Sequence, residues 1–236
     1  MNTGDLVAQQ LDSNGFPIVP VQWSAAAELD AKAPGDRVIV TYDADPTSLN
    51  FGQGIPFRHS ELSSQQQASL TAEQVDFLRG SRINERPFGL NFRDRPDLAG
   101  LLGDIVNSTP VFVGPPSLQG RDREAFPTDD GNRYSEFKQA NQDRPEMVVV
   151  SANDGMTHVF DASTGDEIVA YLPNKIINGE PYANPLSQIT SVSYSHKFFN
   201  DLTPSINDLF VRSRTDFVRR WRTVMVAGLR GGGKGY

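Results

Sequence analysis

The sequence predicts an all-β fold with a minor helix, arranged as part of a β-propeller. Its 236 residues include 20 glycines and 16 prolines, which is typical of short strands joined by turns. Three apolar segments follow one another at constant spacing between residues 146 and 173. A Thr-Pro pair also introduces an apolar segment twice, which indicates an internal repeat.

Composition places the chain among soluble globular proteins and argues against nucleic acid as a partner. Apolar residues make up 38% of the chain, and the mean hydropathy is -0.42. Lys and Arg number 22 against 29 Asp and Glu, a net charge of -7 that repels a polyanion. Cysteine is absent, which excludes disulfides and cysteine zinc sites. No apolar run is long enough to cross a bilayer, so no membrane span is expected.

Residues 1–36 are expected to be a linker or a preceding segment. Pro17 and Pro20 interrupt any periodicity, so no firm element is expected there up to about Ala33. The propeller part is expected to occupy residues 37–236. Its first strand is predicted over residues 37–42, which are mostly β-branched or aromatic. The acidic turn at residues 43–46 ends that strand.

One helix is predicted, directly after Thr71. Thr71 as N-cap and Gln74 three residues later form a capping box. Val75 and Leu78 share one face of this helix, and Gly80 ends it.

The segment that follows this helix has two interpretations. Basic residues alternate with aromatic and apolar ones over residues 82–95, a pattern also found where proteins bind single-stranded nucleic acid. Acidic residues such as Glu85 and Asp94 interrupt the positive charge, which favours a solvated connector.

The most informative segment, residues 146–173, predicts a three-stranded meander. Strands are expected over residues 147–151, 156–160 and 167–172, with turns at Asn153-Asp154-Gly155 and Ser163-Thr164-Gly165. Val149, Val159 and Val169 are spaced evenly along it. Such a regular meander is the unit from which propeller blades are built.

The internal repeat consists of an Asp/Asn-rich approach, a Thr-Pro pair and a strand. The first copy covers residues 104–113 with Pro110, and the second covers residues 200–211 with Pro204. Proline is tolerated at the first residue of a strand, so each pair is expected to mark the start of a blade. About two blades are therefore visible. The polar insertion at residues 115–144 is expected to be a surface loop outside the core.

Four segments, in order, resemble the signature of PilY-type adhesins of type IV pilus tips. They are residues 75–82, 102–114, 152–165 and 221–236. An ordered series of motifs is more specific than any single one. The residues expected to carry this signature structurally are Asp104, Pro110, Asn153, Asp154, Gly155, Asp161, Gly165, Pro204 and Gly228.

The resemblance implies a quinoprotein-like propeller, of which this chain would be the N-terminal, incomplete part. It implies an exported tip adhesin and pilus biogenesis factor, carried through the periplasm to the cell surface. Pilus assembly, retraction control and surface attachment would be its roles, and minor pilins of the tip complex and a host or abiotic surface its partners. The family's calcium loop is expected beyond Tyr236, so no catalytic, cofactor or metal site is expected in the chain.

A basic cluster near the C-terminus is the candidate for partner docking. Arg219 and Arg220 stand beside Trp221, and such a patch suits an acidic partner such as a pilin. In the alternative interpretation, which the pattern favours, the cluster is a solvated loop and Trp221 anchors the next strand.

Histidine chemistry is not expected. His59, His158 and His196 are far apart in the sequence, and none has paired carboxylates nearby. His158 alternates with Met156 and Phe160 on a predicted strand, which favours a core histidine with satisfied hydrogen bonds.

Two alternative functions use the same fold. A quinone-cofactor (PQQ-type) dehydrogenase has similar turns, but it closes its repeats with a docking tryptophan, whereas the third predicted strand ends in Tyr171-Leu172-Pro173. A scaffold for envelope assembly is not separated from an adhesin by the sequence. Because two units cannot close a propeller, the chain alone is expected to have unpaired strand edges and marginal solubility.

Overall fold

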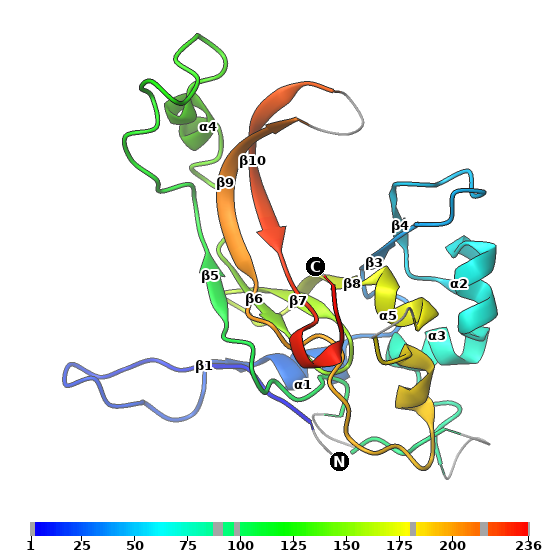
Figure 1. Cartoon of the computed structure of the whole chain (residues 1–236). Helices are drawn as coiled ribbons and strands as arrows, with labels where there is room; N and C mark the ends of the chain where they lie inside the picture. Colours follow the sequence, from blue (N-terminus) through cyan, green and yellow to red (C-terminus); the bar gives the residue numbers. More distant parts are fainter. Residues whose placement is uncertain (1–2, 87–91, 97–99, 180–182, 213–216, 236) are drawn as a thin grey trace.

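A six-stranded sheet forms the centre of the fold, with the strand order β4-β3-β8-β7-β6-β5 (Figure 1). This computed structural model describes residues 3–86, 92–96, 100–179, 183–212 and 217–235. The strands are β3 (Ile39–Tyr42), β4 (Gly54–Pro56), β5 (Val111–Val113), β6 (Met147–Ser151), β7 (Thr157–Asp161) and β8 (Glu167–Leu172).

Strands β5 to β8 form an antiparallel meander in sequence order, which confirms the predicted meander. Val149 pairs with Val159, and Val159 pairs with Val169, so their even spacing is the register of the sheet. Gly155 at φ +99° and Gly165 at φ +79° occupy the two turns, in a backbone region that other residues adopt at a cost.

A second, separate sheet is a long antiparallel hairpin made of β9 (Ser205–Arg212) and β10 (Arg219–Val226). Strands β5 and β9 start directly after Pro110 and Pro204, as the repeat predicts. The repeats lie side by side, since the Thr109 N–H donates to Thr203 Oγ1 at 2.8 Å. Within the described residues, β5 to β8 form a four-stranded antiparallel unit of the central sheet, called the blade below, and β9 and β10 form a separate hairpin. The described strands form no closed propeller.

One face of the central sheet is buried. Leu172 on this face packs against residues of α3 and α5. Val150 and Phe160, which the strand register places on the same face, pack against α1. The opposite face, with Val169 and Tyr171, is only half-buried, an arrangement that is common for antiparallel strands.

The prediction of a single minor helix is too low. The described residues contain α1 (Ala25–Ala31), α2 (Ser64–Ser69), α3 (Ala72–Leu78), α4 (Tyr134–Ala140) and α5 (Asn174–Asn178), with 3-10 turns at His59–Glu61, Leu186–Thr190 and Arg230–Gly232. Helix α3 is the predicted one, and both hydrogen bonds of its capping box are present. Helices α2 and α5, with six and five residues, are too short to show a period in the sequence, and α4 buries only Tyr134.

The expectation of no firm element before residue 37 is wrong. Strands β1 (Val7–Ala8) and β2 (Trp23–Ser24) pair with each other, and α1 follows directly. Trp23 and Leu29 are buried against the central sheet. A cap at Ser24 and a run of alanines start the helix, a signal that was overlooked. The domain boundary at residue 37 stays a prediction.

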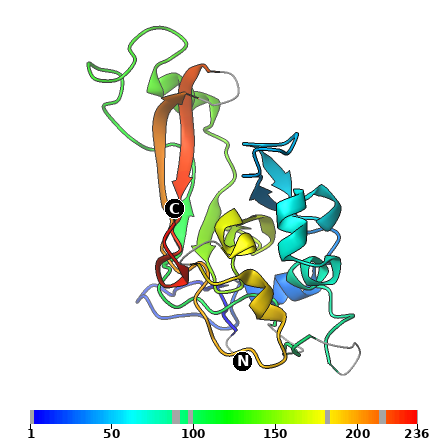
Figure 2. The ribbon, with the colours of Figure 1, turned by 45° about the vertical axis from the view of Figure 1, so that its right-hand side comes forward.

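Two segments expected to be solvated carry buried side chains. The insertion at residues 115–144 contains α4 and buries Tyr134 against the β9–β10 hairpin, beside which it arches in Figures 1 and 2. In the connector at residues 82–95, Arg95 is buried and its Nε donates to Glu85 Oε1 at 2.6 Å. Residues 87–91 of that connector lie outside the described residues.

Candidate functional site

His158 is the second residue of β7, with both ring nitrogens beside carboxylates. Its Nδ1 is 2.8 Å from Glu167 Oε1, and its Nε2 is 3.0 Å from Asp154 Oδ2. Glu167 also accepts hydrogen bonds from Nε and Nη2 of Arg37, each at 2.8 Å. The expectation that no histidine has paired carboxylates nearby is therefore wrong. Strand pairing supplies one carboxylate and the tight turn before β7 supplies the other.

The opposite charges of His158, Glu167 and their partners favour the ionised form of each group. Burial opposes the charge on His158, but Asp154 and then Glu167 outweigh it and raise the pKa of the imidazole to about 9. Burial likewise opposes ionisation of Glu167, yet hydrogen bonds from Arg37 and His158 bring its pKa below the ordinary value. At neutral pH His158 is an imidazolium that donates to both carboxylates.

Burial decides what this network can do. The side chains of His158 and Glu167 are fully shielded from solvent, and the imidazole has no free nitrogen to offer a substrate. The prediction of a satisfied core histidine is confirmed. Sequence reasoning missed Arg37 and Glu167, because they are far apart in the chain and nothing local links them.

The signature residues of the first repeat and turn converge at the base of the blade. Asp104 accepts from the Asn153 N–H at 3.0 Å through its carbonyl and from His196 Nε2 at 2.9 Å through its carboxylate. Asp154 accepts the Gly103 N–H at 3.0 Å. These bonds join the start of the repeat to the first turn of the meander.

The remaining signature residues hold turns and strand ends. Asp161 caps the second turn by accepting the N–H groups of Ser163 and Thr164 at 2.8 and 3.1 Å. Gly165 faces the Trp23 ring, and a Cβ placed there would lie 2.7 Å from it. The Gly228 carbonyl accepts the Leu202 N–H at 3.3 Å. Their role as a family signature stays a prediction.

The chain offers no assembled metal cage in the ranges that the structure describes, where no group of three or more His, Cys, Asp or Glu could hold an ion. Asp45 accepts the Thr47 N–H at 2.9 Å and Asp129 accepts from Asn132 Nδ2 at 2.5 Å, so these acidic residues hold their own turns. Within the same ranges, no helix has the length and apolarity needed to cross a membrane.

The predicted docking cluster is divided by the structure. Arg219 and Arg220 are exposed at the start of β10. Trp221 is buried, and its Nε1–H donates to the Asn132 carbonyl at 2.8 Å. Its ring packs edge-on against Tyr134, 4.8 Å between centroids. Trp221 therefore anchors the insertion to β10 and is buried, while Arg219 and Arg220 stay exposed. The cluster begins a strand and is not the loop of the alternative interpretation.

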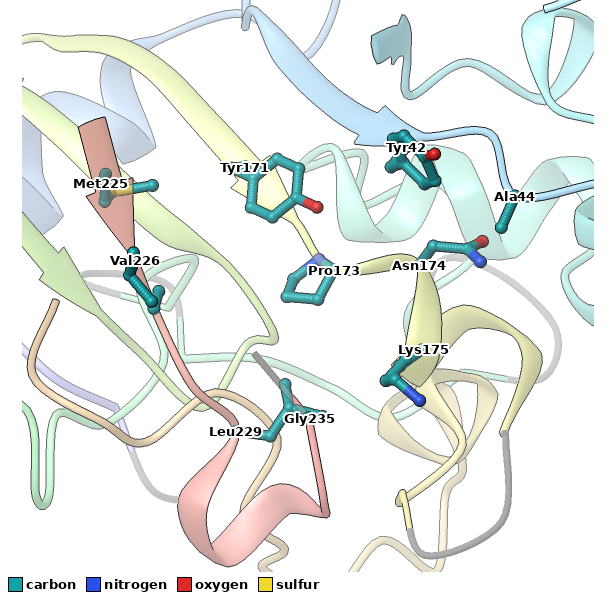
Figure 3. Close-up of a pocket in the computed structure, with 11 residues that line it drawn as sticks. Tyr42, Ala44, Tyr171, Pro173, Asn174, Lys175, Met225, Val226, Leu229 and Gly235 are labelled. Atoms are coloured by element: carbon teal, nitrogen blue, oxygen red, sulfur yellow. The ribbon is translucent and has the colours of Figure 1, made fainter. Parts of the chain in front are cut away.

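A groove of about 600 Å³ runs between β10 and the β3–β8 side of the central sheet (Figure 3). Tyr42, Tyr171 and Met225 contribute apolar walls, and Lys175 brings a positive charge. Strand β10 pairs with β9 along one edge, and no described strand pairs with its other edge. Apolar walls beside an open strand edge suit an extended polypeptide better than a small polar substrate.

Comparison with known proteins assigns the chain to a family. The family model of the "PilY1 beta-propeller domain" matches residues 102–236, more than half of the chain. The chain belongs to the PilY1 family. It is 32% identical over 250 residues to the type IV pilus biogenesis factor PilY1 of Pseudomonas aeruginosa (strain UCBPP-PA14), covering 98% of this chain and 19% of that protein. No solved structure matches it significantly.

A second PilY1 relative agrees. The chain is 33% identical over 232 residues to a PilY1 homolog of Xylella fastidiosa (strain Temecula1 / ATCC 700964), covering 98% of this chain and 17% of that protein. The chain thus spans about a fifth of the length of these PilY1 relatives. Both are named as pilus biogenesis factors, so the dehydrogenase and scaffold alternatives are not favoured. The resemblance to PilY-type proteins is confirmed.

Proposed function

We propose that this chain is the N-terminal part of the propeller of a type IV pilus biogenesis factor and acts through protein surfaces, without catalysis. The PilY1 family match over residues 102–236 carries the proposal. The buried ion network of His158 supports it, because the polar residues gathered in the blade bond to one another and not to a cavity.

Within this function, the finer roles are surface attachment at the pilus tip, pilus assembly and retraction control. The partners are minor pilins and a host or abiotic surface, and the location is the periplasm and then the cell surface. In this proposal the calcium site lies in a part of the full-length protein outside residues 1–236, since the chain covers 19% of one relative. Asp45 and Asp129 each direct one carboxylate oxygen at their own turn.

An in-frame deletion of the codons for residues 102–236 in the producing bacterium tests the general function. Loss of surface pili and of twitching motility is expected, with recovery from an intact copy of the gene. Counting pili in a strain unable to retract them separates a defect in assembly from one in retraction. Normal pili and motility, with the shortened protein still present in the envelope, would contradict the proposal.

The exposed arginines give a residue-level test of partner docking. Reversing both charges in Arg219→Glu/Arg220→Glu is expected to weaken binding to a purified minor pilin by about 10-fold at low salt. A matched variant, Arg86→Glu/Arg123→Glu, makes the same charge change at two exposed arginines elsewhere and is expected to bind normally. Equal binding by the two variants would remove the docking role of this patch.

A further inference from the structure

Residues 9–21 form a finger, a loop that doubles back on itself and projects away from the body of the molecule (Figures 1 and 2). The Ile18 N–H donates to the Gln10 carbonyl at 2.8 Å, and the Asp12 N–H donates to the Phe16 carbonyl at 2.8 Å. These bonds between its two arms give the finger a defined backbone.

The base of the finger is fixed to the blade. Strands β1 and β2 pair at its root, where the Asp5 carboxylate accepts from the Ser24 hydroxyl at 2.8 Å. Trp23 is buried, and its Nε1–H donates to the Ala162 carbonyl at 3.0 Å. The finger is therefore held in one orientation relative to the sheet, which lowers the entropic cost of docking it.

Five apolar side chains of the finger are exposed to solvent. Clustered exposed apolar residues mark an interaction surface. The exposed fractions are 56% for Leu11, 67% for Phe16, 41% for Ile18, 79% for Val19 and 40% for Val21.

The charge of the finger narrows the choice of partner. Asp12 is the one charged residue between Leu6 and Ala27, and no Lys or Arg precedes Lys32. Hydrogen bonds from the backbone of Phe16 and Asn14 lower the pKa of Asp12, so the finger is negative at neutral pH. An anionic lipid surface is bound through Lys and Arg, and it would repel this segment. The partner that suits the finger is an apolar cleft in a protein, with neutral or basic residues at its border.

The length of the relatives indicates where that cleft lies. The chain covers 19% and 17% of two PilY1 proteins, while 98% of the chain aligns with each of them. A partner within the same polypeptide is present at high effective concentration, so even a modest apolar contact is occupied. We infer that the finger docks into an apolar cleft in the part of the full-length protein outside residues 1–236, where it clamps the first blade to the rest of the chain.

Cysteine labelling tests this contact directly, because the chain has no cysteine of its own. Phe16→Cys and Val19→Cys are introduced separately into this chain and into the full-length protein, and maleimide labelling of the finger peptide is followed by mass spectrometry. Labelling in the full-length protein is expected to be slower by about 10-fold or more. Leu49→Cys, at a residue 99% exposed, is the matched control and is expected to label equally in both proteins.

A second measurement needs no substitution. Amide hydrogen exchange over residues 9–21 is expected to be slower in the full-length protein than in the isolated chain. Equal labelling and equal exchange in the two proteins overturn the inference. So does protection that rises with the concentration of the isolated chain, which indicates a second copy. Protection that requires phosphatidylethanolamine/phosphatidylglycerol vesicles or a purified pilin overturns it as well. None of these outcomes depends on whether the protein serves pilus biogenesis.

Discussion

His158 shows how a polar residue is accommodated inside a blade. Each of its nitrogens donates to a carboxylate, and Arg37 balances the second negative charge. A buried charge left without such partners would cost several kcal/mol. The alternation of His158 with apolar residues predicts its burial. Its partner Glu167 could not be predicted, because only the pairing of β7 with β8, in which Glu167 lies opposite Phe160, brings the two side chains together on one face.

Stability should depend on pH through His158. The folded pKa, raised to about 9, lies above the ordinary value of 6.5, so this histidine stabilises the fold below pH 6.5 and that stabilisation is lost as pH rises through 9. His158→Gln is expected to be less stable at pH 6 and to lose less stability between pH 6.5 and 9. Urea unfolding at several pH values measures this.

The matched control for that titration is His59→Gln, at a histidine that lies in a 3-10 turn outside the network. Its stability is expected to fall between pH 6.5 and 9 as steeply as that of the unaltered chain. A slope that survives in His158→Gln would show that another group is responsible.

Gly165 is a second residue with a sharp prediction. At φ +79° a substitution strains the backbone, and a Cβ would also clash with the Trp23 ring at 2.7 Å. Gly165→Ala is expected to destabilise the chain by about 2–3 kcal/mol. Gly131→Ala, at φ +84° with no atom within 4 Å, isolates the backbone strain and is expected to cost about 1 kcal/mol. Equal midpoints in urea would contradict the clash.

At the scale of elements, the elements predicted correctly are those with strong local signals, although the local cap of α1 at Ser24 did not lead to its prediction. The meander is visible because its strands, turns and even spacing lie within residues 146–173. Helix α3 is visible because Thr71 and Gln74 form its cap. Helix α4 shows no apolar period in the sequence, because Tyr134 is its only buried residue. Tyr134 packs against the β9–β10 hairpin, which is distant from α4 in the sequence.

The contact between the insertion and the hairpin can be broken at Trp221. Tyr134 completes it by donating its hydroxyl to Asp208 Oδ2 at 2.6 Å, and burial together with Asp208 raises the pKa of Tyr134 to about 12. Trp221→Ala removes the ring on which Tyr134 rests and is expected to cost about 3 kcal/mol. Trypsin should then cut at Arg121 and Arg123 before the blade unfolds.

The control for this contact is Phe217→Ala, at an exposed aromatic residue beside the same hairpin. It is expected to leave both the unfolding midpoint and the trypsin pattern unchanged. If Trp221→Ala kept the insertion protected, the insertion would be held by contacts other than those of the Trp221 ring.

At the scale of the whole molecule, the two repeat units are joined through their shared motif. The Asn107 side chain donates to Asp201 Oδ2 at 2.7 Å, and the Thr109 N–H donates to Thr203, so equivalent positions of successive repeats bond to each other. The sequence therefore predicted the repeat and its strands. It did not predict that β3 would add in parallel to β8, because a parallel contact between distant strands leaves no local pattern.

The open edge of β10 predicts how the isolated chain behaves. A strand edge without a described partner strand, beside an apolar groove, is a template for another strand, so the chain is expected to associate as its concentration rises. Val226→Lys, at a groove residue that is 51% exposed, should weaken this association without lowering stability, because a charge on an edge strand disfavours pairing.

The control is Leu209→Lys, which changes an exposed residue of β9. This variant should associate like the unaltered chain. Sedimentation velocity separates the outcomes. A monomer at every concentration would show that the edge is already protected by the chain itself, and equal weakening by both variants would show that net charge, not the β10 edge, controls association.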